Sequence, residues 1–128
     1  MKIIKKYQYK HYNRFQDTDG RKYLVENIKV PSVTTILSAT KDMTQLNDWR
    51  RRVGNEEANK IMKQASTVGT EMHQVLEYSL NGQGYYNDME EGTKPRMMAK
   101  TILDNIKIQE VWGNEVSLEY QNKFAGTC

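Results

Sequence analysis

The sequence lacks the features that mark secreted, membrane-spanning and thiolate-metal proteins. Cys128 is the only cysteine in the 128 residues, so there is no disulfide framework and no thiolate zinc cluster. No apolar run approaches the roughly 20 residues of a membrane span. The opening Met-Lys-Ile-Ile-Lys-Lys lacks the apolar region of a signal peptide. These absences favour a cytoplasmic protein with no membrane partner.

The composition is that of a folded domain. Hydrophobic residues make up 38% of the chain and charged residues 27%, which allows one domain with a real core. The net charge of +3 comes from 19 basic and 16 acidic residues, which is compatible with a polyanionic partner without requiring one.

We expect an α+β fold in one incomplete domain with three consecutive regions. Residues 1–30 form a β-hairpin region, because aromatic and β-branched residues flank a turn cluster at residues 17–20. Residues 31–109 are helical by their apolar spacing, and residues 111–128 alternate like the first strands of a sheet. Because the last strand reaches Cys128 without a cap or tail, we expect the sequence to be the N-terminal part of a longer protein.

Capping residues and apolar spacing divide the helical region. Ser32, Thr44 and Asn55 are candidate N-caps, Gly54 ends one helix, and Pro95 lies near the start of the last. Two sets of residues are expected to be buried: Ala58, Ile61, Met62 and Ala65 in one helix, and Met98, Ile102 and Ile106 in the last.

Residues 69–77 combine an apolar stripe with a polar pair. Apolar residues recur at helical spacing on one face, and His73 and Glu77 lie one turn apart on an adjacent face. An imidazole and a carboxylate placed in this way can bind a metal ion together. The alternative is an ordinary surface pair beside a core stripe. Gly69 weakens a helix, so we expect it to allow close approach of another backbone or a ligand.

Basic and aromatic residues leave two interpretations open. Arg50, Arg51 and Arg52 follow Trp49 and could hold phosphates, or they could form a solvated basic face. The aromatic residues of the first 30 positions could stack on bases, although such a face more often packs on a core.

Three segments in order carry a family resemblance. The first is Pro-Ser-Val-Thr-Thr-Ile-Leu at 31–37, and the second runs from Leu46-x-x-Trp49 to Gly-Thr-x-x-His-x-x-x-Glu at 69–77. The third pairs Trp-Gly-x-Glu at 112–115 with Phe-Ala-Gly-Thr at 124–127. The set spans residues 21–128 and resembles the RecB-like branch of the PD-(D/E)XK nuclease superfamily. More narrowly, it is similar to phage exonucleases related to the mitochondrial genome maintenance exonuclease.

The resemblance implies a restriction-endonuclease-like fold and a Mg²⁺- or Mn²⁺-dependent DNA exonuclease. Such an enzyme would act in phage DNA replication, recombination or repair, in the host cytoplasm. His73 maps onto the family's metal-binding His, and Glu77 onto an acidic position of the same helix. Glu115 maps onto a recurrent Glu that is either functional or only structural. Arg50 and Arg52, together with Thr70 and Ser32, are the residues expected to contact DNA, single-stranded DNA included.

The family's first metal-binding Asp and its acid-x-Lys pair have no counterpart up to Cys128. We therefore expect the 128 residues alone to be inactive. Two alternatives remain: a non-catalytic nucleic-acid-binding module of the same fold, and a structural or interaction protein.

Overall fold

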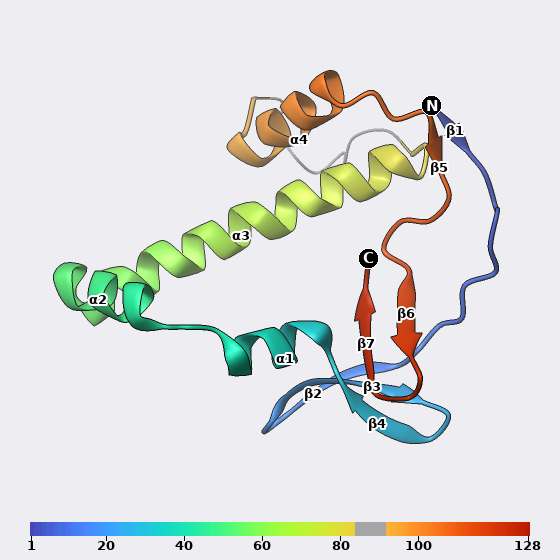
Figure 1. Cartoon of the computed structure of the whole chain (residues 1–128). Helices are drawn as coiled ribbons and strands as arrows, with labels where there is room; N and C mark the ends of the chain where they lie inside the picture. The colour runs from blue at the N-terminus through green and yellow to red at the C-terminus, as the bar shows by residue number, and fades with distance from the viewer. Residues whose placement is uncertain (84–91) are drawn as a thin grey trace. The chain divides into compact units, whose positions relative to one another are not determined.

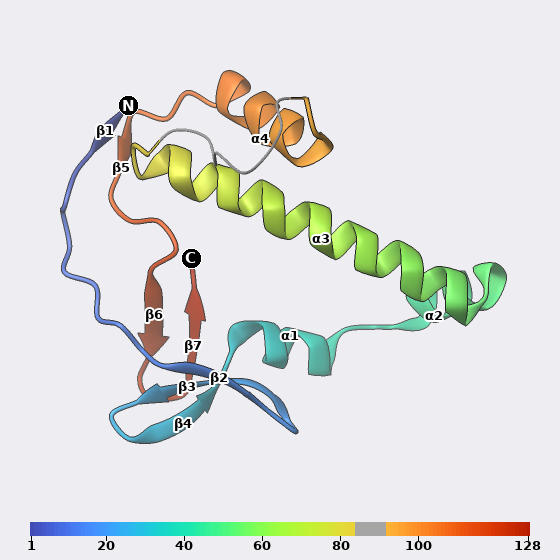
Figure 2. The same ribbon diagram turned by 180° about the vertical axis from the view of Figure 1, so that it is seen from behind.

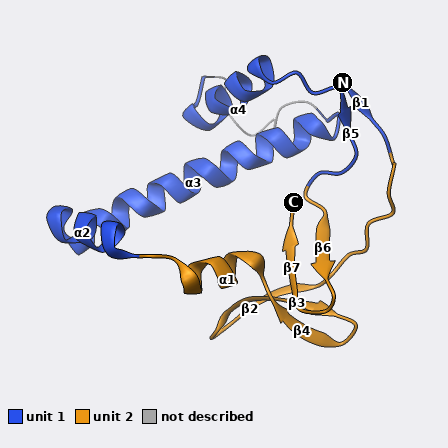
Figure 3. Cartoon of the chain, in the orientation of Figure 1, with its two compact units in different colours: residues 1–4, 43–114 blue, residues 5–42, 115–128 orange. Residues whose placement is uncertain are grey.

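The structure, a computed structural model, describes residues 1–83 and 92–128 (Figures 1 and 2). The chain divides into two compact units (Figure 3), which are Met1–Ile4 with Met43–Asn114, and Lys5–Asp42 with Glu115–Cys128. Long helices and strands occupy separate stretches of the chain, so the predicted α+β class is confirmed. Within the described residues, no helix has the length and apolar character needed to cross a membrane.

The first unit consists mainly of helices. It contains α2 (Thr44–Val53), α3 (Asn55–Leu80) and α4 (Lys94–Asn105), with a short parallel pair of β1 (Lys2–Ile3) and β5 (Glu110–Val111). α3 and α4 pack side by side (Figure 1), and Val75 of α3 and Ala99 of α4 are fully buried. The small side chain of Ala99 permits this close packing.

α3 is one continuous helix that runs through Gly69. Gly54, with a φ of +86°, separates it from α2, and Asn81 follows its last residue. Thr44 and Asn55 are the first helical residues rather than the caps, a shift of one position from the prediction. A Cβ built on Gly69 would meet no atom within 4 Å, so the expected close approach of another backbone is wrong for the described residues.

The predicted buried stripes are largely wrong. Ile61, Met62, Met98 and Ile106 are 39%, 43%, 38% and 54% exposed, and Ala65 is exposed as well. Ala58 is buried as predicted, and so is Val75 of the apolar stripe at residues 69–77. In α4 the buried residues are instead Pro95 and Ala99. Small residues occupy the closest contacts and long apolar side chains lie at the margins, a distinction that apolar spacing alone does not make.

The second unit contains a three-stranded antiparallel sheet of β2 (Arg14–Asp17), β3 (Gly20–Val25) and β4 (Ile28–Pro31), followed by α1 (Val33–Thr40). The predicted hairpin is present, and a second hairpin that was not predicted adds β4 through a left-handed pair, Glu26 and Asn27. Ser32 caps α1 as predicted.

A hairpin of β6 (Ser117–Tyr120) and β7 (Phe124–Thr127) completes the second unit. Gln121 and Asn122 form its turn, with φ of 47° and 54°. Ala125 of β7 joins the buried cluster formed by Tyr23, Val25 and Val30. The sheet and this hairpin therefore share one core.

Candidate functional site

The His73–Glu77 pair lies on the C-terminal half of α3. Val75, between them in the sequence, is fully buried, so the periodicity of the helix turns both neighbours toward the opposite side. His73 is exposed and Glu77 is half-buried. No hydrogen bond or ion pair joins the two side chains within residues 1–83 and 92–128, so both are available to a third partner.

Asn114 holds the end of α3 near Glu77. Its Nδ2 donates to the Glu77 carbonyl oxygen at 3.1 Å, and the Asn81 backbone N–H donates to the same oxygen at 3.0 Å. Both contacts use the backbone of Glu77 and leave its carboxylate uncommitted. Sequence reasoning missed Asn114, although it lies inside the Trp-Gly-x-Glu motif that the resemblance used.

His73 and Glu77 fit a hard divalent ion only as part of a ligand set. An exposed imidazole and a carboxylate one turn apart are suitable donors, and the imidazole suits Mn²⁺ better than Mg²⁺. Among the described residues, no group of three His, Cys, Asp or Glu side chains comes together as a metal site. This part of the chain therefore offers two ligands, where hard divalent ions take six or more oxygen ligands, water included.

The predicted DNA-contacting arginines have different surroundings. Arg50 is half-buried and donates to Asn59 Oδ1 at 2.5 Å and to Met62 Sδ at 3.0 Å, which ties α2 to α3. Arg52 is exposed and lines a hollow on α2 beside the Arg51–Asp48 ion pair. Arg52 is thus the one whose guanidinium is presented to solvent.

Thr70 and Ser32 also differ in accessibility. Thr70 is exposed on α3, one turn before Gln74. Ser32 is only 2% exposed, and its Oγ accepts a hydrogen bond from the Thr35 backbone N–H at 3.0 Å. The structure gives the Ser32 hydroxyl a capping role at the start of α1.

Glu115 precedes β6 in a left-handed conformation, with a φ of 52°. It is exposed at the rim of a polar hollow whose wall includes Tyr23 and Thr127, and the hydroxyls of these two residues lie 2.9 Å apart. Glu115 and Ser32 belong to the second unit. The other predicted site residues, His73, Glu77, Arg50, Arg52 and Thr70, belong to the first.

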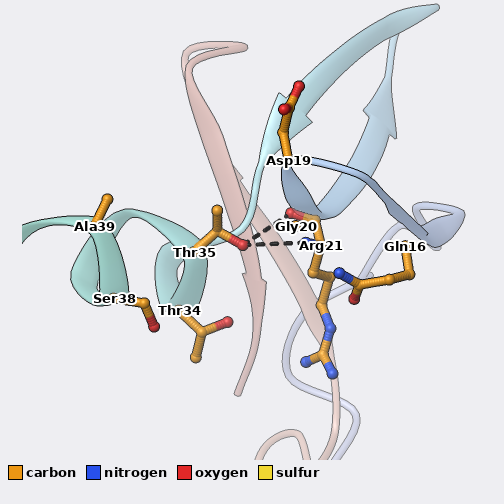
Figure 4. A pocket seen from close by; sticks show the side chains of 8 residues that line it. All are labelled: Gln16, Asp19, Gly20, Arg21, Thr34, Thr35, Ser38 and Ala39. Carbon is orange, nitrogen blue, oxygen red and sulfur yellow. Dashed lines mark hydrogen bonds between the residues drawn. The ribbon is translucent and has the colours of Figure 1, made fainter. Parts of the chain in front are cut away.

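A second polar hollow, which sequence reasoning missed, lies in the second unit between the β2–β3 turn and α1 (Figure 4). Arg21, Thr34 and Ser38 contribute to its wall. The signal available in the sequence was weak: two hydroxyl residues at i and i+4 in a predicted helix, and an arginine after a turn glycine.

Comparisons with known protein families, with curated proteins and with solved structures find no match for this chain. A function for the protein therefore depends on its motifs and on the geometry described above.

Proposed function

We propose that the chain supplies the helical and DNA-contacting part of a metal-dependent DNA nuclease, similar to the phage exonucleases of the RecB-like branch. The observation that carries the proposal is the placement of His73 and Glu77. Both lie in the ordered motif set that suggested the family, and α3 holds them one turn apart, on the side opposite the buried Val75. Burial of the apolar residues of α3 does not by itself require a histidine at position 73.

These side chains would have different roles in phosphodiester hydrolysis. His73 and Glu77 would hold one side of a Mg²⁺ or Mn²⁺ ion, and the exposed Arg52 would hold a backbone phosphate of the DNA. The ion, when bound, supplies charge neutralisation at the phosphate and an activated water. The ion would need further ligands, because the described residues bring together no group of three His, Cys, Asp or Glu side chains.

A second candidate is a nucleic-acid-binding module of the same fold without catalysis. The described residues bring together no three metal-ligating side chains, which favours this alternative over an enzyme complete in these residues. The module would bind DNA in a salt-dependent manner and would cleave none.

Replacement of His73 tests the nuclease proposal. In the protein expressed from its complete reading frame, His73→Ala should lower the rate of DNA cleavage by about 10²–10³-fold, the scale for removal of one stabilising group. Because His73 is exposed, the free energy of unfolding should change by no more than about 0.5 kcal/mol. The measurement is cleavage of end-labelled single- and double-stranded DNA with Mn²⁺, with Mg²⁺ and with EDTA.

Gln74→Ala is the matched control, because Gln74 is the next residue on α3 and is also exposed. It should cleave at the parent rate. Equal rates for the parent and His73→Ala would remove His73 from the site. A protein that binds DNA but cleaves neither substrate with either ion would support the binding module instead.

A further inference from the structure

The hollow between the β2–β3 turn and α1 has a volume of about 590 Å³ and a polar wall (Figure 4). The strand register places Gln16 directly opposite Arg21, so both side chains lie on the same face of the sheet. Thr34 and Ser38 lie one turn apart on α1 and face the same space. Four side chains from three elements therefore converge there.

The contacts of Thr35 hold α1 against β3 and thereby form the hollow. Thr35 Oγ1 lies 3.2 Å from both the backbone N and the backbone O of Arg21, and the Ser32 backbone N–H donates to the same Arg21 oxygen at 2.9 Å. Gly20, with a φ of +118°, makes this approach possible, because a Cβ on Gly20 would lie 2.9 Å from Thr35 Oγ1 and Cγ2. α1 is thereby fixed against β3, and the wall of the hollow is preformed.

Arg21 is the basic residue that lines the hollow, and Asp19 is the acidic one. Lys22 Nζ lies 2.9 Å from Asp17 Oδ2 and 3.5 Å from Asp19 Oδ2, so one lysine engages both carboxylates of the turn. The hydrogen bond from Lys22 lowers the pKa of Asp17. No ion pair among residues 1–83 and 92–128 involves Arg21. Figure 4 shows the Asp19 carboxylate pointing away from the Arg21 guanidinium.

The wall is rich in hydrogen-bond donors. A guanidinium offers five N–H donors and no acceptor, the Ser38 hydroxyl can donate, and the Gln16 amide adds an NH₂ group. The Thr34 hydroxyl also lines the hollow, but it is hydrogen-bonded to Ser32 Oγ at 3.0 Å. A phosphate oxygen accepts from guanidinium, hydroxyl and amide donors, and an arginine can bind phosphate in a bidentate manner.

From these features we infer that the hollow binds a phosphate of a single-stranded DNA backbone through Arg21 and Ser38. The choice of DNA as the source rests on the proposed function. It is supported by the openness of the hollow, since Arg21, Thr34 and Ser38 are all exposed. It is also supported by Arg14, two residues before Gln16 on the same strand face, which extends the positive surface beyond one phosphate.

The test is binding of a short fluorescein-labelled single-stranded oligonucleotide to the 128-residue chain, followed by fluorescence anisotropy in EDTA over a range of NaCl concentrations. Arg21→Gln should weaken binding about tenfold and lower the slope of log K against log salt by about 1. The variant Ser38→Ala should weaken binding about threefold to tenfold with the slope unchanged, because it removes one neutral donor.

Lys29→Gln is the matched control for loss of one positive charge. Lys29 lies on the opposite face of the same sheet, with its ammonium 5.2 Å from the centre of the Phe15 ring. It should leave the affinity within about twofold of the parent. Equal losses for Arg21→Gln and Lys29→Gln would show diffuse attraction to the basic chain and would overturn the inference, as would parent affinity for both hollow variants. Thermal unfolding followed by circular dichroism verifies that each variant is folded.

Two further measurements distinguish a DNA phosphate from a free phosphate ion as the ligand. The combined binding and cleavage results distinguish this inference from the nuclease proposal. An oligonucleotide with uncharged methylphosphonate linkages should bind the parent and Arg21→Gln equally. Inorganic phosphate that displaces DNA better than chloride at equal ionic strength would make the hollow a small-anion site and overturn the choice of DNA. Arg21-dependent binding without cleavage by the complete protein would defeat the nuclease proposal alone, whereas cleavage with Arg21-independent binding would defeat this inference alone.

Discussion

Arg50 and Arg52 differ in what their guanidinium groups contact. Arg50 donates to Asn59 and Met62 on α3, whereas Arg52 is exposed on α2. Arg50→Ala should therefore lower the free energy of unfolding by about 1 kcal/mol, since it removes two hydrogen bonds between α2 and α3. Arg52→Ala should change stability by less than about 0.5 kcal/mol and should lower the salt slope of DNA binding by about 1. Urea unfolding and anisotropy measure the two effects.

Arg51→Ala is the control for this pair, because Arg51 is occupied by an exposed ion pair with Asp48. It should cost less than about 1 kcal/mol of stability. A change in salt slope for Arg50→Ala with none for Arg52→Ala would reverse the assignment. It would also show that the contacts to Asn59 and Met62 open when DNA binds.

At the scale of single residues, the sequence predicted features that depend on local chemistry. Ser32 was expected to cap a helix, and it does so, because a serine before a helix satisfies a nearby backbone N–H. The contact of Thr35 with Arg21 was not predicted. It joins residues 14 positions apart, and it depends on how α1 folds back on β3. The accessibility of Arg50 likewise depends on where α3 places Asn59.

At the scale of elements, Gly69 is the informative position of α3. It lies inside a continuous helix, and an added Cβ would meet no atom within 4 Å. Gly69→Ala should therefore raise the free energy of unfolding by about 0.5–1 kcal/mol, because glycine loses more backbone entropy in a helix than alanine does. Urea unfolding of the 128-residue chain measures this change.

The reverse substitution at a nearby exposed position, Ala65→Gly, should lower stability by about 1 kcal/mol and is the control. A destabilised Gly69→Ala would mean that another part of the protein contacts the helix there. A stabilised Gly69→Ala that has lost DNA binding would support the close approach of a ligand to this side of α3, which was one of the two roles expected for the glycine.

Helices and turns were predicted better than the residues that they bury. The turns and glycines at the ends of elements have local causes, such as the left-handed Gln121–Asn122 pair and the positive φ of Gly54. Burial depends on the partner of each face. The buried residues of α4 are Pro95 and Ala99, whereas Met98 and Ile106 are exposed although their spacing is that of a core stripe.

At the scale of the whole molecule, the two units are interleaved along the chain. The first unit takes Met1–Ile4 and Met43–Asn114, and the second takes the segments between and after them. The sequence pattern predicted one β-hairpin region over residues 1–30. In the structure, β1 of this region pairs instead with β5, more than 100 residues later in the chain. A two-residue strand has no periodicity to read, and its pairing is fixed only by tertiary structure.

The count of metal ligands leads to a prediction for the 128 residues as a whole. His73 and Glu77 offer two donors, and the described residues bring no third His, Cys, Asp or Glu to them. Two donors leave a hard divalent ion mostly hydrated and weakly held, and nothing would position a water in line with the scissile phosphate. The purified 128-residue chain with Mn²⁺ should therefore cleave neither single- nor double-stranded DNA, while it still binds single-stranded DNA with a measurable salt slope. The assay is cleavage of end-labelled DNA on denaturing gels beside binding by anisotropy. Cleavage by the 128 residues that depends on Mn²⁺ and on His73 would show that the ligands are completed within this chain, by residues that the structure does not bring to α3.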